Sequence, residues 1–260
     1  MAVYTLGIDV GSTTSKAVIL KNGKVLSGKA LVKAGTGTVG PEQVLQEVLK
    51  DAGIEKSSIA YTVSTGYGRH NIELADNDMS ELSCHAMGAQ FIFGNVRTVI
   101  DIGGQDIKVL GVENGIMTAF QMNDKCAAGT GRFLETMARA LCVDVNDMGR
   151  LGSESTKTVQ ISSTCTVFAE SEVISQLSMG EDIRDIAAGI HRAVASKVVG
   201  LVHRVGLHEP VVMTGGVSHN CDVVRALEQQ LGCRIAISEL SQYAGAIGAA
   251  MFGFQKVSSD

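Results

Sequence analysis

Two cysteines occupy positions where a thiolate could bind a metal ion or a cluster. Cys126 lies in "NDKCAAGTGRFLE" and Cys165 in "SSTCTVFAESE". Apolar residues recur at helical spacing after each cysteine, which predicts that both thiols lie at or near the start of a helix. The N–H groups and the dipole of a helix N-terminus favour an anion, so they lower the pKa of a thiol. Thiolates are the normal ligands of zinc and of iron–sulfur clusters, which need about four of them.

One chain offers only two cysteines in this setting, which leaves two interpretations open. Two copies related by a two-fold axis could each give half of a four-cysteine site. Alternatively, Cys126 and Cys165 are unrelated buried thiols, and their spacing alone favours this interpretation. The other cysteines form no CxxC pair and are expected to be ordinary core or surface thiols: Cys84, Cys142, Cys221 and Cys233.

An aspartate followed by a glycine turn occurs twice, in "GIDVGSTTSKAVIL" and in "VIDIGGQDIKVL". Glycine lets backbone N–H groups approach an anion, and neighbouring hydroxyls add donors. The residues expected to contact phosphates are Ser12, Thr13 and Lys16 at the first turn, and Gly103 and Gly104 at the second. Asp9 and Asp101 could hold Mg²⁺ mostly through water if they face each other across a cleft. Gln105 could orient an attacking water, as glutamine does in some other phosphohydrolases.

A third apolar strand, in "VVMTGGVSHN", also ends in a pair of glycines. A glycine pair can admit a flat base and a ribose against the backbone. The residues expected to frame an adenosine are Gly215, Gly216 and Asn220. Each motif alone could be a plain strand and a tight turn, but three of them at this spacing indicate a nucleotide site.

The elements that carry these motifs are expected to form an internal duplication. Residues 4–32 and 97–122 both predict a three-stranded meander, which argues for two similar lobes around a cleft. Residues 41–52, 129–142, 167–177 and 182–206 predict helices, and a closing helix ends the chain. We expect an N-terminal lobe of residues 1–96 and a C-terminal lobe of residues 97–260, with the last helix packing back on the N-terminal lobe.

Composition limits the classes of function. The net charge is −5 with scattered basic residues, so no clustered positive face for nucleic acid is expected. No apolar run approaches the ~20 residues of a membrane span. The start, "MAVYTLGIDVG", lacks a basic segment and is not expected to be a signal peptide, so we expect a cytoplasmic protein. Two further glycine-rich stretches, "GTGTVG" and "STGYGR", are expected to be loops.

The three turn motifs resemble those of the actin, sugar-kinase and heat-shock chaperone ATPase superfamily, in the same order. This resemblance implies an α/β fold of two duplicated ribonuclease-H-like lobes with ATP in a cleft between them. The cysteine segments, together with "DIGGQD" and "SELSCHAMGA", closely resemble the activator (archerase) subunit of 2-hydroxyacyl-CoA dehydratases, in the benzoyl-CoA reductase ATPase family. This second resemblance runs from end to end of the chain.

The second resemblance implies a homodimer with one [4Fe–4S] cluster held between the subunits, with Cys126 and Cys165 as ligands. It implies ATP/ADP and Mg²⁺ as further cofactors. The activity implied is ATP-driven transfer of one electron from reduced ferredoxin or flavodoxin to a 2-hydroxyacyl-CoA dehydratase component. Two alternatives on the same fold are a small-molecule kinase and a regulatory or chaperone-like ATPase without metal.

Overall fold

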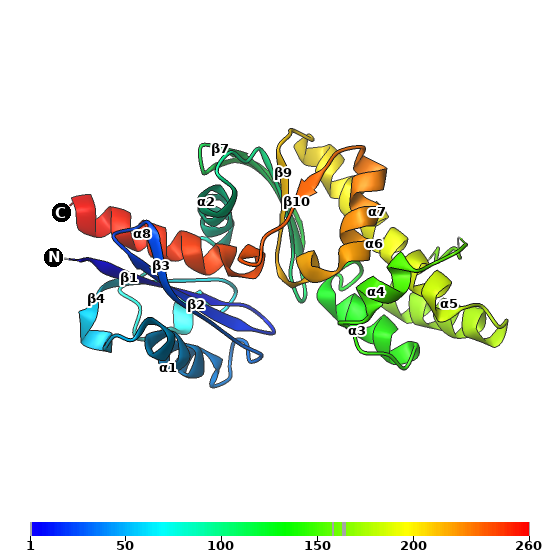
Figure 1. The fold of residues 1–260 in the computed structure, drawn as a ribbon, viewed down its shortest axis with the longest axis horizontal. Helices are drawn as coiled ribbons and strands as arrows, with labels where there is room; N and C mark the ends of the chain where they lie inside the picture. The colour runs from blue at the N-terminus through cyan, green and yellow to red at the C-terminus, as the bar shows by residue number, and fades with distance from the viewer. Residues whose placement is uncertain (1, 158, 163–164, 260) are drawn as a thin grey trace. The chain divides into compact units, whose positions relative to one another are not determined.

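The computed structural model describes residues 2–157, 159–162 and 165–259. The chain divides into two compact units, and each contains a five-stranded sheet (Figure 1). The first unit comprises Met1–Val96, Val112–Thr118 and Ser238–Asp260, and the second comprises Arg97–Gly111 and Ala119–Ile237. The α/β class expected from the sequence is confirmed. The division into functional domains 1–96 and 97–260, with a cleft between them, stays a prediction.

The first unit has the strand order β3-β2-β1-β4-β5. Its strands are β1 (Tyr4–Val10), β2 (Ser15–Lys21), β3 (Val25–Val32), β4 (Ile59–Thr65) and β5 (Asn77–Asp78). Its helices are α1 (Gly40–Ala52), α2 (Glu81–Phe93) and α8 (Ala244–Ser259), with 3-10 turns at Lys56–Ser58, Arg69–Asn71 and Ser241–Tyr243. β1 to β3 form the antiparallel meander predicted from the sequence, and β4 runs parallel to β1.

Side chains of β1 alternate between the two faces of this sheet, as in any strand. Leu6 belongs to a buried cluster with α1. Gly7 faces α8, and a Cβ there would collide with the Ala246 carbonyl of that helix. Asp9 lies two positions further on the same face as Gly7, so α8 and the carboxylate share one side of the sheet.

The second unit has the strand order β10-β9-β6-β7-β8. Its strands are β6 (Thr98–Ile102), β7 (Ile107–Glu113), β8 (Ile116–Asn123), β9 (Val211–Thr214) and β10 (Ile235–Ala236). Its helices are α3 (Gly131–Ala140), α4 (Met148–Ser153), α5 (Thr166–Ser178), α6 (Ile183–Val205) and α7 (Cys221–Leu231), with a 3-10 turn at Gly216–His219. One large apolar cluster joins β6, β7 and β9 to these five helices.

The two sheets have equivalent topology, which confirms the predicted duplication. β6 pairs antiparallel with β7 and parallel with β9, just as β1 pairs with β2 and β4. The equivalence therefore extends beyond the meander to the parallel strand that follows it. Within the described part of the chain, no helix combines the length and the apolar character needed to cross a membrane.

Candidate functional site

The first glycine turn joins β1 to β2, where Asp9 and Lys16 are direct partners in the register. Lys16 Nζ lies 3.2 Å from Asp9 Oδ2, and the Gly11 N–H donates to the Thr14 carbonyl at 3.0 Å. The strand pairing thus fixes a lysine beside the carboxylate. Two of the predicted phosphate contacts form the half-buried tip of this turn: Ser12 and Thr13.

One oxygen of the Asp9 carboxylate differs from the other in its hydrogen bonding. Asp9 Oδ1 is buried and has no hydrogen-bond partner among the described residues. Glycine backbones border the carboxylate, because a Cβ at Gly66 would collide with Oδ1 and one at Gly245 would lie 3.0 Å from Oδ2. A buried oxygen without a donor costs free energy. This oxygen is therefore suited to a cation or to the water that a cation carries.

The second glycine turn joins β6 to β7 and repeats the geometry of the first. Asp101 and Lys108 are register partners, and the Gly103 N–H donates to the Asp106 carbonyl at 3.0 Å. Lys108 Nζ lies 2.7 Å from Asp106 Oδ2 and 3.6 Å from Asp101 Oδ2. Thr214 Oγ1 donates to Asp101 Oδ1 at 2.7 Å. Both oxygens of Asp101 are thereby held in place.

Sequence reasoning singled out Lys16 but missed Lys108 and Asp106. The signal that could have found them is a gapless alignment of "DVGSTTSK" with "DIGGQDIK". It pairs Lys16 with Lys108, and Thr14 with Asp106. The turn hydrogen bonds follow the same pairing, so the eight-residue motif is duplicated in structure as well as in sequence.

A glycine with positive φ follows the parallel strand in each unit. Gly66 follows β4 with φ of 87°, and Gly215 follows β9 with φ of 81°. Thr65 is the register partner of Asp9, and Thr214 is that of Asp101, so the two glycines are structural equivalents. The stretch "STGYGR" was expected to be only a loop. Its Gly66 instead borders the Asp9 carboxylate.

The stretch "GTGTVG" has a supporting role at the first turn. The Thr36 N–H donates to the Gly11 carbonyl at 2.9 Å. A Cβ at Gly35 would lie 2.5 Å from the Ser12 carbonyl carbon and oxygen. This loop therefore packs on the back of the turn, and glycine is needed for the close approach.

The third turn, from Gly215 to Asn220, ends by capping α7. Asn220 Oδ1 accepts from the N–H groups of Asp222 and Val223 at 3.2 and 3.0 Å, which satisfies two donors at the helix start. Its Nδ2 lies 3.1 Å from His191 Nε2. The Asn220 side chain, predicted to frame an adenosine, is thus engaged with the protein, and its part in such a site would be to hold the turn.

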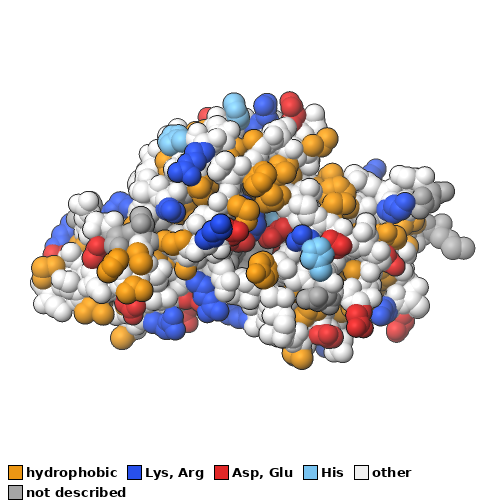
Figure 2. Space-filling model, turned by 180° about the vertical axis from the view of Figure 1, so that it is seen from behind, with side chains coloured by type: hydrophobic (Ala, Val, Ile, Leu, Met, Phe, Trp, Pro, Cys, Tyr) orange, Lys and Arg blue, Asp and Glu red, His pale blue; other side chains and the backbone are white. Residues whose placement is uncertain are grey.

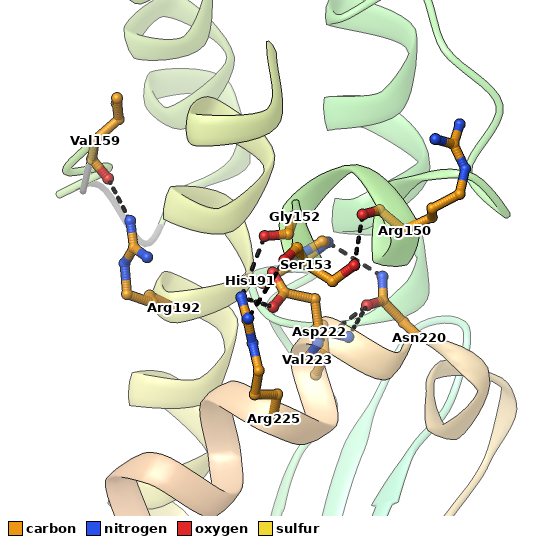
Figure 3. A network of polar contacts seen from close by, with 10 residues as sticks. All are labelled: Arg150, Gly152, Ser153, Val159, His191, Arg192, Asn220, Asp222, Val223 and Arg225. Atoms are coloured by element: carbon orange, nitrogen blue, oxygen red, sulfur yellow. Dashed lines mark hydrogen bonds and ion pairs between the residues drawn. The ribbon is translucent and has the colours of Figure 1, made fainter. Parts of the chain in front are cut away.

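A buried polar network continues from Asn220, and sequence reasoning missed it (Figure 3). His191, fully buried in α6, has Nδ1 2.7 Å from Asp222 Oδ2, and Arg225 Nη2 lies 2.5 Å from Asp222 Oδ1. Asn220 Oδ1 is used by the cap, so Nδ2 is the group that meets His191. His191 Nε2 must then accept, and Nδ1 donates to Asp222. A neutral His191 with its proton on Nδ1 satisfies every partner.

The second glycine turn also supports the start of α3. The Gly131 and Arg132 N–H groups donate to the carbonyls of Gly103 and Gly104, at 2.9 and 2.8 Å. These bonds satisfy two donors of the first helical turn, which has no side-chain cap. Gln105, at the exposed tip of the same turn, is adjacent to this contact. The turn and the start of α3 are therefore joined directly through the backbone.

The two cysteines lie differently relative to their helices. Cys165 is the N-cap residue of α5, as predicted. Cys126 precedes α3 by several residues, because Gly129 has φ of 86° and the helix begins only at Gly131. The helix, expected from roughly residue 129, begins two residues later, and the dipole argument applies more directly to Cys165. Both cysteines are exposed.

Exposed apolar side chains accompany both cysteines. Val167 and Phe168, directly after Cys165, are 68% and 66% exposed, and Phe120 and Met122 are exposed on β8 just before Cys126. Large apolar side chains next to each candidate ligand favour contact with another surface. On the face shown in Figure 2, Lys and Arg side chains are interspersed with Asp and Glu.

Among the other cysteines, Cys84 is a core residue of α2. Burial raises the pKa of its thiol from 9.0 to about 12. A neutral, fully buried thiol is a poor nucleophile and a poor ligand. Cys142 and Cys221 are exposed, and Cys233 is half-buried. The expectation that these four are ordinary core or surface thiols agrees with their burial.

Known proteins resemble this chain along nearly its whole length. The (R)-2-hydroxyglutaryl-CoA dehydratase activating ATPase of Acidaminococcus fermentans is 63% identical over 257 residues, which are 98% of this chain and 99% of that protein. The crystal structure of component A of the same dehydratase matches with a TM-score of 0.97 over 98% of this chain and 99% of its own. The activator of 2-hydroxyisocaproyl-CoA dehydratase from Clostridium difficile, solved with bound ADPNP, is 50% identical with a TM-score of 0.96, covering 99% and 96% of the two chains.

More distant structures share only the fold. A glucokinase of the ROK family from Streptomyces griseus, 15% identical, matches 97% of this chain and 99% of its own with a TM-score of 0.60. A family model, described as the BadF/BadG/BcrA/BcrD ATPase family, matches residues 6–253. The chain belongs to the BadF/BadG/BcrA/BcrD ATPase family.

Proposed function

We propose that this chain is the ATP-dependent activator of a 2-hydroxyacyl-CoA dehydratase, to which it passes one electron at a time. The relatives that are named as dehydratase activators support this role. The alignment with each of them covers at least 97% of this chain. A cytoplasmic homodimer that takes its electrons from reduced ferredoxin or flavodoxin belongs to the same proposal.

The nucleotide would be held by backbone turns together with one lysine. Lys16 would meet the phosphates, with Ser12 and Thr13 as further donors on the first turn. The second turn would contribute Gly103 and Gly104. The adenosine would lie against the turn that begins with Gly215 and Gly216 and is held by Asn220. The two phosphate turns share the same backbone hydrogen bond, from the N–H of Gly11 or Gly103 to the carbonyl three residues later.

The residues present also fit Mg²⁺. The buried Asp9 Oδ1, which has no donor in the part of the chain that the structure describes, is the kind of oxygen that accepts a hydrated cation. Asp101, fixed by Thr214 and Lys108, would provide the second carboxylate. The cation would neutralise charge on the phosphates. Gln105, exposed at the tip of its turn, would orient the attacking water.

The donor set of the cysteines fits a [4Fe–4S] cluster shared by two chains. Cys126 and Cys165 are exposed and accompanied by exposed apolar side chains, so two chains together would supply four thiolates. Cys165, at the N-terminus of α5, would bring favourable N–H groups to the negatively charged centre. The cluster would accept and release the electron.

The observation that carries this proposal is the bond between the second glycine turn and α3. The carbonyls of Gly103 and Gly104, on the predicted phosphate turn, accept from the first N–H groups of the helix that follows Cys126. A change at the phosphates would therefore alter the position of α3.

Lowering the reduction potential at which one electron is delivered costs about 1.4 kcal/mol per 59 mV. A decrease of several hundred millivolts therefore needs on the order of 10 kcal/mol. A nucleotide can supply that amount, whereas one ordinary protein contact cannot.

The test is anaerobic purification followed by counting of iron and sulfide per dimer. About four of each per two chains supports the shared cluster. A full cluster on each chain contradicts the shared-ligand arrangement. A colourless protein that still activates a dehydratase favours a metal-free ATPase, and robust phosphoryl transfer to a sugar or carboxylate favours a kinase.

A further inference from the structure

The chain segment between the two cysteines is attached to α6 and α7 by close backbone contacts. α4 lies in this segment, after α3 and before Cys165. A Cβ at Gly152 would collide with Asp222 Oδ2 and lie 2.6 Å from His191 Nδ1. A Cβ at Gly149 would lie 3.0 Å from Asn220 Oδ1. Both glycines thus let the backbone of α4 lie directly on the network that begins at Asn220.

Side chains of α6 and α7 hold the same segment by hydrogen bonds. Arg225 Nη2, already paired with Asp222, donates to the Gly152 carbonyl at 3.2 Å. Arg192 Nη2 donates to the Val159 carbonyl at 3.1 Å. Figure 3 shows Arg225 and His191 converging on Asp222, while the side chain of Arg150 points away from them.

Asp185 of α6 holds the middle of this segment. Its Oδ1 accepts from the N–H groups of Thr156 and Lys157, at 2.7 and 3.0 Å. The Lys157 N–H, followed by that of Thr156, lowers the pKa of Asp185, so the anchor is ionised. Val159 and Ile161, further along, are buried in the main apolar cluster. The described part of the segment that leads to Cys165 is thus held to α6 and α7 from Gly152 to Ile161.

The other end of the network is the turn from Gly215 to Asn220. Asn220 uses Oδ1 for the α7 cap and Nδ2 for His191, and His191 uses Nδ1 for Asp222. Each described partner is engaged, so a shift of Asn220 has no loose group to absorb it. Such a shift must displace the start of α7, His191, or both, and α4 lies against both.

We propose that His191, Asp222 and Arg225 are positioning residues that transmit nucleotide occupancy of the Gly215–Asn220 turn to the segment leading to Cys165. The inference rests on the proposed function for the adenosine site at that turn. It is separate from the link between the second glycine turn and α3, which acts on the side of Cys126. Two cysteines of one ligand set would then respond to two different parts of the same nucleotide.

The test is hydrogen–deuterium exchange of the full chain, purified anaerobically, with and without ADPNP. Nucleotide is expected to change exchange at residues 159–162 and in the first turn of α5. In Arg225→Ala, ADPNP affinity is expected to stay within about threefold, because an exposed arginine away from the turn has a small effect on binding. The nucleotide-dependent difference at residues 159–162 and in α5 is expected to fall below half, whereas the difference in α3 is unchanged.

Arg150→Ala is the matched control. Arg150 lies on α4, but its ion pairs are with Asp147 and Glu154 of the same segment, so the nucleotide-dependent difference should persist. Asp222→Asn, which keeps the shape but loses the charge, should repeat the effect of Arg225→Ala. A purely structural role predicts that Arg225→Ala raises exchange equally with and without nucleotide, and that result overturns the proposal.

Two further outcomes overturn the proposal: an unchanged difference in Arg225→Ala, or an equal loss in Arg150→Ala. A wild-type chain that binds ADPNP with no change at residues 159–162 also overturns it, while the proposed function stands. Iron content and ADPNP binding, measured on the same preparation, test the proposed function separately. Loss of iron with an intact exchange response therefore contradicts the cluster and leaves the coupling supported.

Discussion

Lys108 is enclosed between two carboxylates, whereas its repeat partner Lys16 pairs with one among the residues that the structure describes. Lys108 lies 2.7 Å from Asp106 Oδ2 and 3.6 Å from Asp101 Oδ2, with a side chain that is 2% exposed. The position equivalent to Asp106 in the first repeat is Thr14, which carries no charge. The first turn therefore balances one lysine against one aspartate, and the second retains one negative charge. The duplicated motif has diverged into a turn with an available lysine and a turn whose lysine is an internal counter-ion.

Replacing Lys108 by Met should make the second turn bind a divalent cation more tightly. Without the ammonium group of Lys108, the negative charges of Asp101 and Asp106 are uncompensated, and a divalent metal ion can bind in its place. We expect the affinity for Mn²⁺, measured by electron paramagnetic resonance with ADPNP present, to rise on the order of tenfold, or about 1.4 kcal/mol. The free energy of unfolding of the variant should also be lower than that of the wild type, by about 3 kcal/mol.

Lys16→Met is the matched comparison. Its lysine is more accessible, so we expect weaker ADPNP binding and no gain in Mn²⁺ affinity. Equal effects of the two substitutions on both ligands would contradict the assignment of different roles to the two lysines.

The sequence predicted the meander, its duplication and the three glycine turns because these depend on local pattern. An apolar strand followed by aspartate and glycine has few alternatives in structure. It did not predict that "STGYGR" and "VMTGGV" are equivalent, because the segments that join each meander to its parallel strand differ greatly in length. A periodic apolar pattern also marks Phe133 and Leu134 as helical, but it does not reveal the positive φ at Gly129 that delays α3.

The polar network that begins at Asn220 and includes His191 could not be predicted from the sequence, for a different reason. The packing of α6 on α7 brings His191 to Asp222, and no spacing within the chain records that contact. Asp222 and Arg225 lie three residues apart on α7, so their ion pair can be recognised only once that helix is known. Asn220 was singled out as a nucleotide residue because it follows the third glycine turn. Its capping role becomes visible only once the start of α7 is known.

Gly66→Ala should weaken Mg²⁺-dependent nucleotide binding. A Cβ at Gly66 would collide with Asp9 Oδ1, the oxygen proposed to face the cation. The substitution also forces alanine into the left-handed region, at a cost of roughly 1–2 kcal/mol. We expect ADPNP affinity in Mg²⁺ to fall on the order of tenfold in calorimetry, while the weaker binding in EDTA changes little.

Gly53→Ala separates backbone strain from contact. Gly53 ends α1 with φ of 63°, and a Cβ there would meet no atom of the described residues within 4 Å. This variant should lose only the stability that the left-handed backbone costs, and it should keep its Mg²⁺-dependent binding. Loss of that binding in both variants would show that general destabilisation, and not the space beside Asp9, is responsible.

Cys126→Ser and Cys165→Ser should each lose most of the bound iron, because a hydroxyl is a poor replacement for a thiolate ligand. Iron and sulfide would be measured after anaerobic purification, with the dimer fraction from light scattering. Cys142→Ser, at an exposed cysteine just after α3, should retain both iron and dimer. Full iron content in Cys165→Ser would remove Cys165 from the proposed ligand set.

Cys84 should lower the free energy of unfolding of the chain at alkaline pH. Burial holds its thiol protonated in the folded state up to a pKa of about 12, whereas the unfolded chain releases the proton near 9.0. The unfolded state therefore gains free energy above pH 9, and the stability contributed by protonated Cys84 is lost between pH 9 and 12. The expected slope is about 1.4 kcal/mol per pH unit, which is the linkage for one proton.

The measurement is denaturant unfolding of wild type and Cys84→Ala at several pH values. Alanine leaves a small cavity, so the variant should be less stable by a constant amount from pH 7 to 9. Above pH 9 this deficit should shrink, because only the wild type carries the titrating thiol. Tyrosines and lysines titrate in both proteins and cancel in the difference. A deficit that stays constant to pH 11 would mean that the folded Cys84 thiol ionises as readily as an exposed one.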